Sequence, residues 1–179
     1  MSPKNLLKAR LNSRLSKLEV DVVAAEIISG ALSMDTLRPL LTETAPVFLF
    51  NFYWILATVA NRSPKALHGL EIPLFHGMQQ HTANESVVRS VLSVFKQVDI
   101  PESIEDALYD FCFRLTEAAD SSIAHRSFAM VVCARICKKY PELSGELLPV
   151  VRQVQETYGT VSPGVRSAAR QVLAMLTPR

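Results

Sequence analysis

The feature that most constrains this chain is an interval that occurs three times. Each of three prolines is followed, 25 residues later, by an arginine and then a serine at the start of an apolar stretch. The pairs are Pro64 and Arg89, Pro101 and Arg126, and Pro141 and Arg166. An interval kept three times indicates an internal repeat, so we expect the chain to be built from copies of one structural unit.

The composition favours helices as the content of that unit. The chain has 6 glycines against 10 prolines, and glycine is the residue that hairpin turns and phosphate-binding loops need most. Ser-Pro pairs, with the serine as a helix cap and the proline as the first helical residue, indicate where helices begin. We predict no strand and helices over residues 3–29 (broken near 13), 34–42, 46–61, 64–79, 85–98, 101–118, 122–139, 141–157 and 163–177.

Pairing the later helices gives the repeat. The clearer units are 64–98, 101–139 and 141–177, preceded by a more divergent pair at 33–61 and an N-terminal cap at 1–30. Helical pairs at this period are typical of a solenoid of the HEAT or armadillo kind. We therefore expect residues 1–179 to form a single all-α domain, an α–α superhelix of about five helical pairs.

One segment resembles a known repeat in its details. The stretch DSSIAHRSFAMVVCARI, residues 120–136, is similar to the second helix of a HEAT repeat. In that family an acid six positions before an arginine forms a ladder between neighbouring repeats, and Asp120 and Arg126 have this spacing. The resemblance implies a structural ladder through these two residues.

A narrower resemblance covers residues 50–179. Trp54, IPESIEDALYDFCF (100–113), SFAMVVCARICKKYPELSGEL (127–147) and SPGVRSAARQVLAML (162–176) look like a family of small bacterial HEAT-like proteins without an assigned activity. Such proteins sometimes carry an adenylosuccinate lyase label. This chain does not support that label, because it is too short and lacks the Ser-Ser-x-Met-Pro-x-Lys-x-Asn loop of the lyase superfamily.

The repeated arginines are the main candidates for a binding site. In HEAT-like solenoids the second helices line the concave surface, so the resemblance implies a stripe that could contact a ligand there. Its members are Arg89, Ser93, Arg126, Met130, Arg166 and Arg170. The alternative, which we favour for Arg126, is that the guanidinium groups link repeats through carboxylates or carbonyls. Arg166 and Arg170 lie one turn apart, and we expect an acidic partner there first.

No catalytic, cofactor or metal site is predicted. The histidines and cysteines form no ligand set at a familiar spacing, and no nucleophile motif or phosphate loop occurs. Five basic residues precede the first acid, Glu19, which leaves 14 basic and 17 acidic residues in the rest of the chain. A mildly acidic body disfavours nucleic-acid binding.

The apolar stretch at 45–60 is expected to be a buried helix rather than a membrane span, because it is short and interrupted by polar residues. We expect Phe52, Trp54 and Leu56 to pack between repeats. An odd number of cysteines and the lack of an apolar signal segment favour a reducing cytoplasm.

These patterns favour a non-enzymatic scaffold that binds another protein or a peptide on its concave surface. Two alternatives stay open. One is nucleic-acid binding in the manner of HEAT-like DNA glycosylases, and the other is an enzyme acting on a small ligand in the groove. A basic groove would favour the first, and a deep pocket with His125 beside a carboxylate would favour the second.

Overall fold

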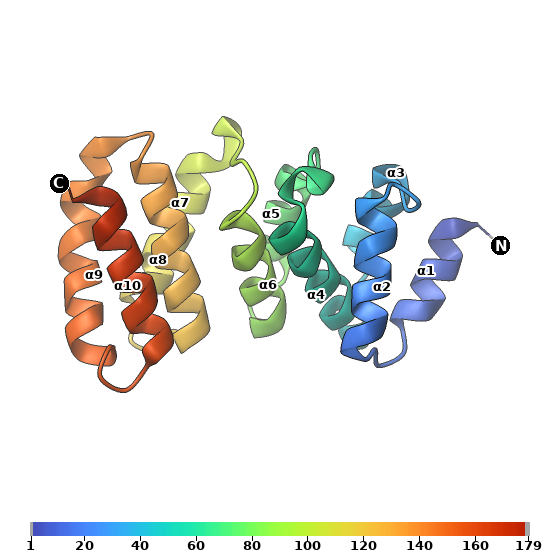
Figure 1. Ribbon diagram of the computed structural model, residues 1–179, viewed down its shortest axis with the longest axis horizontal. Coiled ribbons are helices and arrows are strands. Elements are labelled where there is room, and N and C mark those ends of the chain that lie inside the picture. The colour runs from blue at the N-terminus through green and yellow to red at the C-terminus, as the bar shows by residue number, and fades with distance from the viewer. Residues whose placement is uncertain (1, 178–179) are drawn as a thin grey trace. The chain divides into compact units, whose positions relative to one another are not determined.

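The computed structural model describes residues 2–177, and within that range it contains helices and no strand (Figure 1). The predicted all-α class is confirmed. The α-helices are α1 (Pro3–Leu11), α2 (Lys17–Ile28), α3 (Met34–Leu37), α4 (Pro46–Arg62), α5 (Glu71–Gln80), α6 (Glu85–Phe95), α7 (Glu102–Glu117), α8 (Ile123–Cys137), α9 (Ser144–Tyr158) and α10 (Pro163–Leu176). Short 3₁₀ helices span Arg38–Thr42, Pro64–Leu67 and Pro141–Leu143.

Serine caps fix where several helices begin. Ser16 and Glu19 form a reciprocal capping box at the start of α2, so two backbone N–H groups that lack helical partners are satisfied. Ser122 caps α8 and Ser162 caps α10 in the ordinary one-way manner. At the other end of α2, Gly30 takes a φ of 80°, the left-handed conformation that closes a helix cheaply only when the residue is glycine.

The predicted helix at 64–79 is wrong as a continuous element. Pro64 opens only a 3₁₀ turn, Gly69 has a φ of 87°, and α5 begins at Glu71. The Glu71 carboxylate accepts a hydrogen bond of 2.7 Å from the Gly69 N–H, which stabilises this break. Pro141 likewise opens a 3₁₀ turn ahead of α9. The repeated proline therefore marks the start of a repeat rather than the first residue of an α-helix.

The chain divides into two compact units, Met1–Pro101 and Glu102–Arg179, called unit 1 and unit 2 here. In unit 1 the helices α2, α4 and α6 lie side by side, with α4 in the middle (Figure 1). In unit 2 the helix α8 packs against both α7 and α10, and α9 packs against α10. The organisation of residues 1–179 as one domain stays a prediction.

Helix α4 forms much of the core of unit 1. Phe48, Phe52, Tyr53 and Leu56 are fully buried, and the rings of Phe48 and Phe52 stack at 5.3 Å. Trp54 is only half-buried, so the expected burial holds for Phe52 and Leu56 and is incomplete for Trp54. No helix within the described residues is both long enough and apolar enough to cross a bilayer.

Candidate interaction surface

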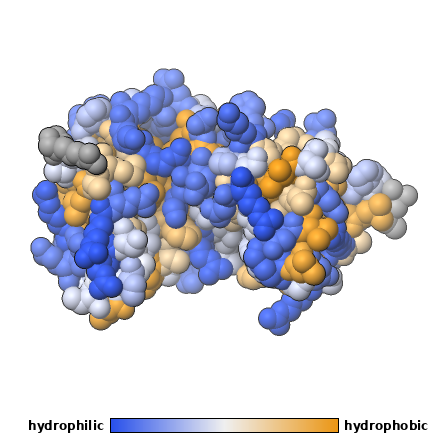
Figure 2. Space-filling model, in the orientation of Figure 1, coloured by the Kyte–Doolittle hydropathy of each residue, from blue (hydrophilic) through white to orange (hydrophobic). Residues whose placement is uncertain are grey.

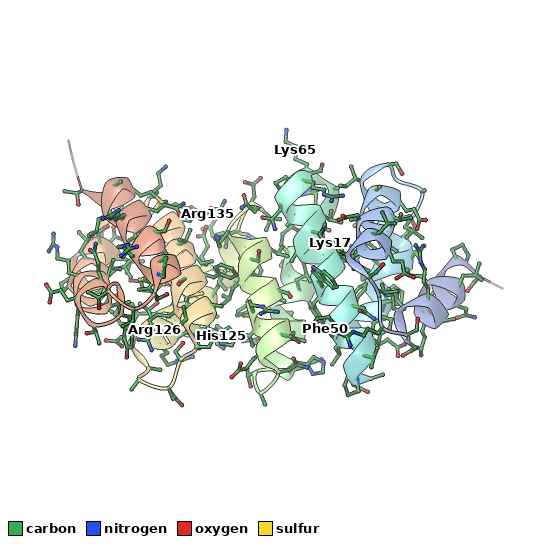
Figure 3. The ribbon with its side chains drawn as sticks, turned by 60° about the horizontal axis from the view of Figure 1, so that its bottom comes forward. Lys17, Phe50, Lys65, His125, Arg126 and Arg135 are labelled. Atoms are coloured by element: carbon green, nitrogen blue, oxygen red, sulfur yellow. The ribbon has the colours of Figure 1, made fainter. Side chains whose placement is uncertain are left out.

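The Arg126 side chain ends under the surface of unit 2, where it binds backbone carbonyls. Its Nη2 donates to the carbonyl oxygens of Ala118 at 2.6 Å, Ser121 at 3.2 Å and Ala119 at 3.5 Å. These carbonyls follow the C-terminal end of α7, where a cation is favourable because the helix dipole is negative there. The guanidinium also lies 4.1 Å from the centre of the Tyr158 ring on α9, a cation–π contact. Arg126 therefore ties α8 to the end of α7 and to α9 (Figure 3).

Arg166 makes a weaker version of the same link. Its Nη1 donates to the Gly159 carbonyl at 3.4 Å, seven residues earlier in the chain, the same offset as between Arg126 and Ala119. In both pairs of helices the arginine of the second helix therefore binds the chain that leaves the first helix. This is an arginine-to-carbonyl link within one pair.

The expected pairing of Arg126 with Asp120 is not seen among the described residues, and the acidic binding partner expected at Arg166 and Arg170 stays a prediction. Asp120 is exposed at the surface, and the hydrogen bonds of Arg126 go to carbonyls instead. Arg166 and Arg170 are exposed, and neither takes part in the ion pairs found within residues 2–177. Carbonyl oxygens take the place of a carboxylate as partners of Arg126, because the turn after α7 places three of them within hydrogen-bonding distance of its Nη2.

Arg89 is the repeated arginine that has no such link. It is exposed on α6, and it makes no side-chain hydrogen bond or ion pair within the described part of the chain. Ser93, one turn later on the same helix, is half-buried. The arginine signature thus has a structural role in unit 2, whereas in unit 1 the Arg89 side chain is exposed.

Unit 1 also exposes apolar side chains on α2 and α4. Leu18 and Val22 on α2 are 74% and 43% exposed, and Val47 and Phe50 on α4 are 47% and 43% exposed. The half-buried Trp54 ring meets the Phe50 ring edge-on at 5.7 Å. Figure 2 shows apolar atoms gathered over α2, and Figure 3 shows Phe50 on α4. We call the exposed rows of α2, α4 and α6 the second-helix face of unit 1.

Polar contacts join these rows across the seams between the helices. The Asp21 carboxylate on α2 accepts hydrogen bonds from Lys17 and from Arg62 of α4. The Gln97 amide, just after α6, donates to the Asn61 amide oxygen on α4 at 3.3 Å. The contacts fix which positions of neighbouring helices lie level with one another.

Arg89 lies level with Trp54. Gln97 comes eight residues after Arg89, and Asn61 comes seven residues after Trp54. Since α4 and α6 run side by side in the same direction (Figures 1 and 3), both side chains lie about two turns before the Asn61–Gln97 contact. The second-helix face therefore includes the exposed Arg89 on α6 besides the apolar side chains of α2 and α4.

A HEAT repeat domain family matches residues 7–176, nearly the whole chain. The protein belongs to this HEAT repeat family. No curated protein and no solved structure matches it. The match confirms the predicted HEAT-like fold, and it extends the family to α1–α4, which the narrower resemblance at 50–179 hardly reached.

With the family known, the helices of this HEAT repeat protein fall into pairs. The first four pairs are α1–α2, α3–α4, α5–α6 and α7–α8, with the 3₁₀ segment Arg38–Thr42 extending α3, and α9–α10 closes the described part of the chain. The second helices α2, α4 and α6 share one face in unit 1, and α8 and α10 pack together in unit 2.

The predicted stripe along the second helices does not form one surface in this HEAT repeat protein. Arg126 and Met130 on α8 are 2% and 0% exposed, so both side chains lie inside unit 2 rather than along an open surface. The reason is that α8 is apolar around nearly its whole circumference and is buried on most sides. That uniform apolar pattern is a signal in the sequence that could have removed both residues from the candidates.

A recess in unit 1 of the HEAT repeat protein carries mixed charge. A recess of about 760 Å³ in unit 1 is lined by basic and acidic side chains, among them Arg62, His68, Glu71 and Asp99. The buried Glu71 carboxylate binds the Gly69 N–H and lies 3.6 Å from the His68 Nδ1. No group of residues that could hold a metal ion occurs in residues 2–177.

The three cysteines do not form a reactive site either. Cys112, Cys133 and Cys137 are all buried free thiols. Burial raises the pKa of the Cys133 thiol well above its ordinary value, so the thiolate that acts as a nucleophile is disfavoured. Their place in the fold is that of small apolar side chains in the core of unit 2.

Proposed function

We propose that this HEAT repeat protein is a non-enzymatic interaction module that holds a segment of a partner protein on the second-helix face of unit 1. Helical repeats present side-by-side helices as a rigid surface, and protein interaction is a common use of that surface. The three free, buried cysteines support a reducing compartment such as the cytoplasm as the place where it acts.

The observation that carries the proposal is the uncovered apolar row on α4. Ten of its 17 residues are buried, yet Val47 and Phe50 are 47% and 43% exposed and Trp54 is only partly buried. Complete burial of such a side chain contributes about 1.5–3 kcal/mol, and covering the exposed part of Val47 or Phe50 contributes about half of that. With Leu18 and Val22 on the adjacent α2, a partner gains this free energy from several side chains at once.

Affinity capture from native lysate tests the proposal when matched variants are included. Phe50→Gln and Leu18→Gln place a polar group on the second-helix face, while Val161→Gln changes a side chain that is 75% exposed in unit 2. We expect partners that the wild type and Val161→Gln retain and that the two face variants lose. Melting temperatures within a few degrees of the wild type show that all variants are folded.

Two outcomes would contradict the proposal. Partners that all three variants retain equally would mean that the second-helix face is not the binding surface. Partners that disappear when the lysate is treated with nuclease would favour the nucleic-acid alternative.

A further inference from the structure

We infer that the exposed side of α10 binds a helix of a partner protein that carries acidic residues. This surface belongs to unit 2, so the inference does not rest on the second-helix face of unit 1. It draws on the register between α8 and α10, on the residues that α10 exposes and on the charges around them. We use the name α10 side for five exposed residues: Arg166, Ser167, Arg170, Gln171 and Ala174.

Helices α8 and α10 correspond position by position at an offset of 40 residues. Ser122 caps α8 and Ser162 caps α10, each by accepting from the N–H three residues later. Arg126 and Arg166 each donate to the carbonyl seven residues earlier. Because caps and links recur at the same offset, residues 40 apart face the same way in their helical pairs.

The positions of α8 that correspond to the α10 side are covered by the next pair of helices (Figure 1). Tyr158 of α9 lies over the Arg126 guanidinium, and α10 comes close to Ser127 at Gly164. The exposed fractions of Arg126, Ser127, Met130, Val131 and Ala134 are 2%, 6%, 0%, 3% and 0%. The α10 side is therefore a surface of the kind that helices cover elsewhere in this fold, and it is uncovered within residues 2–177.

The residues of the α10 side determine which kind of helix can cover it. Met130 and Val131 of α8 are apolar, whereas Arg170 and Gln171 hold the corresponding positions of α10. An apolar helix laid on this side would remove the charges of Arg166 and Arg170 from water without a partner, which is strongly unfavourable. A helix with carboxylates at matching positions compensates both charges.

The acids of the neighbouring repeat do not neutralise these arginines. Helices α8 and α10 contain no aspartate or glutamate, and neither Arg166 nor Arg170 takes part in the ion pairs of the described residues. Glu117 and Asp120 lie at and after the end of α7, where Glu117 lines a hollow together with Arg126.

The charges of the adjoining helix α9 do not supply a counter-charge either. Helix α9 runs antiparallel to α10, so Glu142 and Glu146 at its start lie near the far end of α10 (Figure 1). Glu156 is nearer, but Arg152 precedes it by one turn of α9 and offsets its charge. The positive charge of the α10 side thus remains, and an acidic helix is complementary to it.

Three labelled synthetic peptides of about 18 residues, long enough to form a helix, test this inference. They differ in one row of side chains, spaced i, i+4, i+7 and i+11, which are glutamate, glutamine or lysine. Fluorescence anisotropy measures their binding to the whole chain. We expect the glutamate peptide to bind most tightly and the lysine peptide least, with the difference shrinking in high salt.

Charge reversal on the α10 side locates the binding. In Arg170→Glu, affinity for the glutamate peptide should fall by about two- to fivefold, and affinity for the lysine peptide should rise. Arg114→Glu, at an exposed position of α7, changes the net charge equally and is the matched control. It should leave both affinities close to those of the wild type.

A fourth peptide tests the helical form of the partner. It keeps the glutamates but has two central prolines that prevent a helix, and it should bind more weakly than the glutamate peptide. Equal binding would overturn the helical form.

Three results would overturn the acidic partner. The first is binding that ignores peptide charge, or no binding by any peptide. The second is an equal loss of affinity in Arg170→Glu and Arg114→Glu, which would place the binding elsewhere. The third is a single-stranded oligonucleotide that binds more tightly than the glutamate peptide and is weakened by Arg170→Glu, which would make nucleic acid the partner. The capture experiment on unit 1 is judged separately from all three.

Discussion

At the scale of single residues, the arginine signature serves two purposes. Arg126 and Arg166 bind carbonyls that follow the first helix of their own pair, whereas Arg89 has no such contact. The 25-residue interval predicts that these positions are equivalent in the fold. It does not predict their partners, because a carbonyl partner belongs to the backbone and leaves no mark on residue type. Asp120 has the spacing typical of a ladder and is nevertheless exposed.

Replacing these arginines should therefore reduce stability in a definite order. Arg126→Ala should lower the free energy of unfolding by about 1–3 kcal/mol, because three partly buried carbonyls lose their charged donor. Arg166→Ala should cost less, since it removes one 3.4 Å bond of an exposed side chain, and Arg89→Ala should be nearly neutral. Urea unfolding of the three variants measures this order, and an Arg89→Ala variant as unstable as Arg126→Ala would contradict it.

At the scale of helices, the close approach of α4 and α5 depends on two residues. Gly77 of α5 lies against the Tyr53 hydroxyl of α4, so that a methyl group added at Gly77 would overlap the hydroxyl oxygen. Tyr53 is fully buried, and its hydroxyl has no hydrogen-bond partner among the described residues. The glycine therefore serves packing, although glycine is otherwise unfavourable inside a helix.

A double-mutant cycle checks this contact. Gly77→Ala should destabilise the wild type by about 1–3 kcal/mol, because the overlap outweighs the better helix propensity of alanine. In the Tyr53→Phe background, which removes the hydroxyl, the same change should be neutral or stabilising. Equal effects of Gly77→Ala in both backgrounds, measured by urea unfolding, would show that the two helices do not meet in this way.

The same tyrosine should make stability fall at alkaline pH. Burial raises the pKa of Tyr53 to about 12, above its ordinary value of 10.0. The unfolded chain then loses this proton before the folded chain does, so stability decreases as the pH rises from about 10 to about 12. The loss should reach about 2–3 kcal/mol.

Tyr53→Phe is the control for this pH dependence. Between pH 9 and 12 the variant should lose about 2–3 kcal/mol less stability than the wild type, because its ring has no proton to release. Burial also raises the pKa of Tyr109, so both proteins lose some stability from that group. The quantity to measure is therefore the difference in stability loss between the wild type and Tyr53→Phe. Identical losses in both proteins would contradict the buried position of the Tyr53 hydroxyl.

Most helices could be predicted from the sequence, while the candidate surface could not. Caps and apolar periodicity place the ends of α4, α7 and α8 within about two residues. The break between Pro64 and Glu71 was missed because it depends on the left-handed Gly69 and on its bond to Glu71.

The exposed face was missed for a related reason. Leu18 and Phe50 have the spacing of core residues, and only the packing of α2 and α4 side by side leaves them uncovered. Exposure of an apolar side chain is a property of neighbouring helices rather than of the residue itself.

At the scale of the whole molecule, the open question is whether the two units unfold together. Each unit has its own core, yet the HEAT repeat match runs through both without a gap, from 7 to 176. In repeat proteins each repeat is stabilised by its contacts with the neighbouring repeats, so a chain that is one domain should unfold in a single transition. We predict this behaviour for residues 1–179.

The position of Trp54 makes that prediction measurable. The only tryptophan lies in unit 1, while Arg126 lies in unit 2. If the chain is one cooperative domain, Arg126→Ala should lower the midpoint of Trp54 fluorescence as much as the midpoint of helical circular dichroism, and both curves should superpose. Arg89→Ala serves as the control and should move neither midpoint. A fluorescence midpoint that stays at the wild-type value while part of the dichroism is lost earlier would show two independent domains, because unit 1 would then not respond to a change in the core of unit 2.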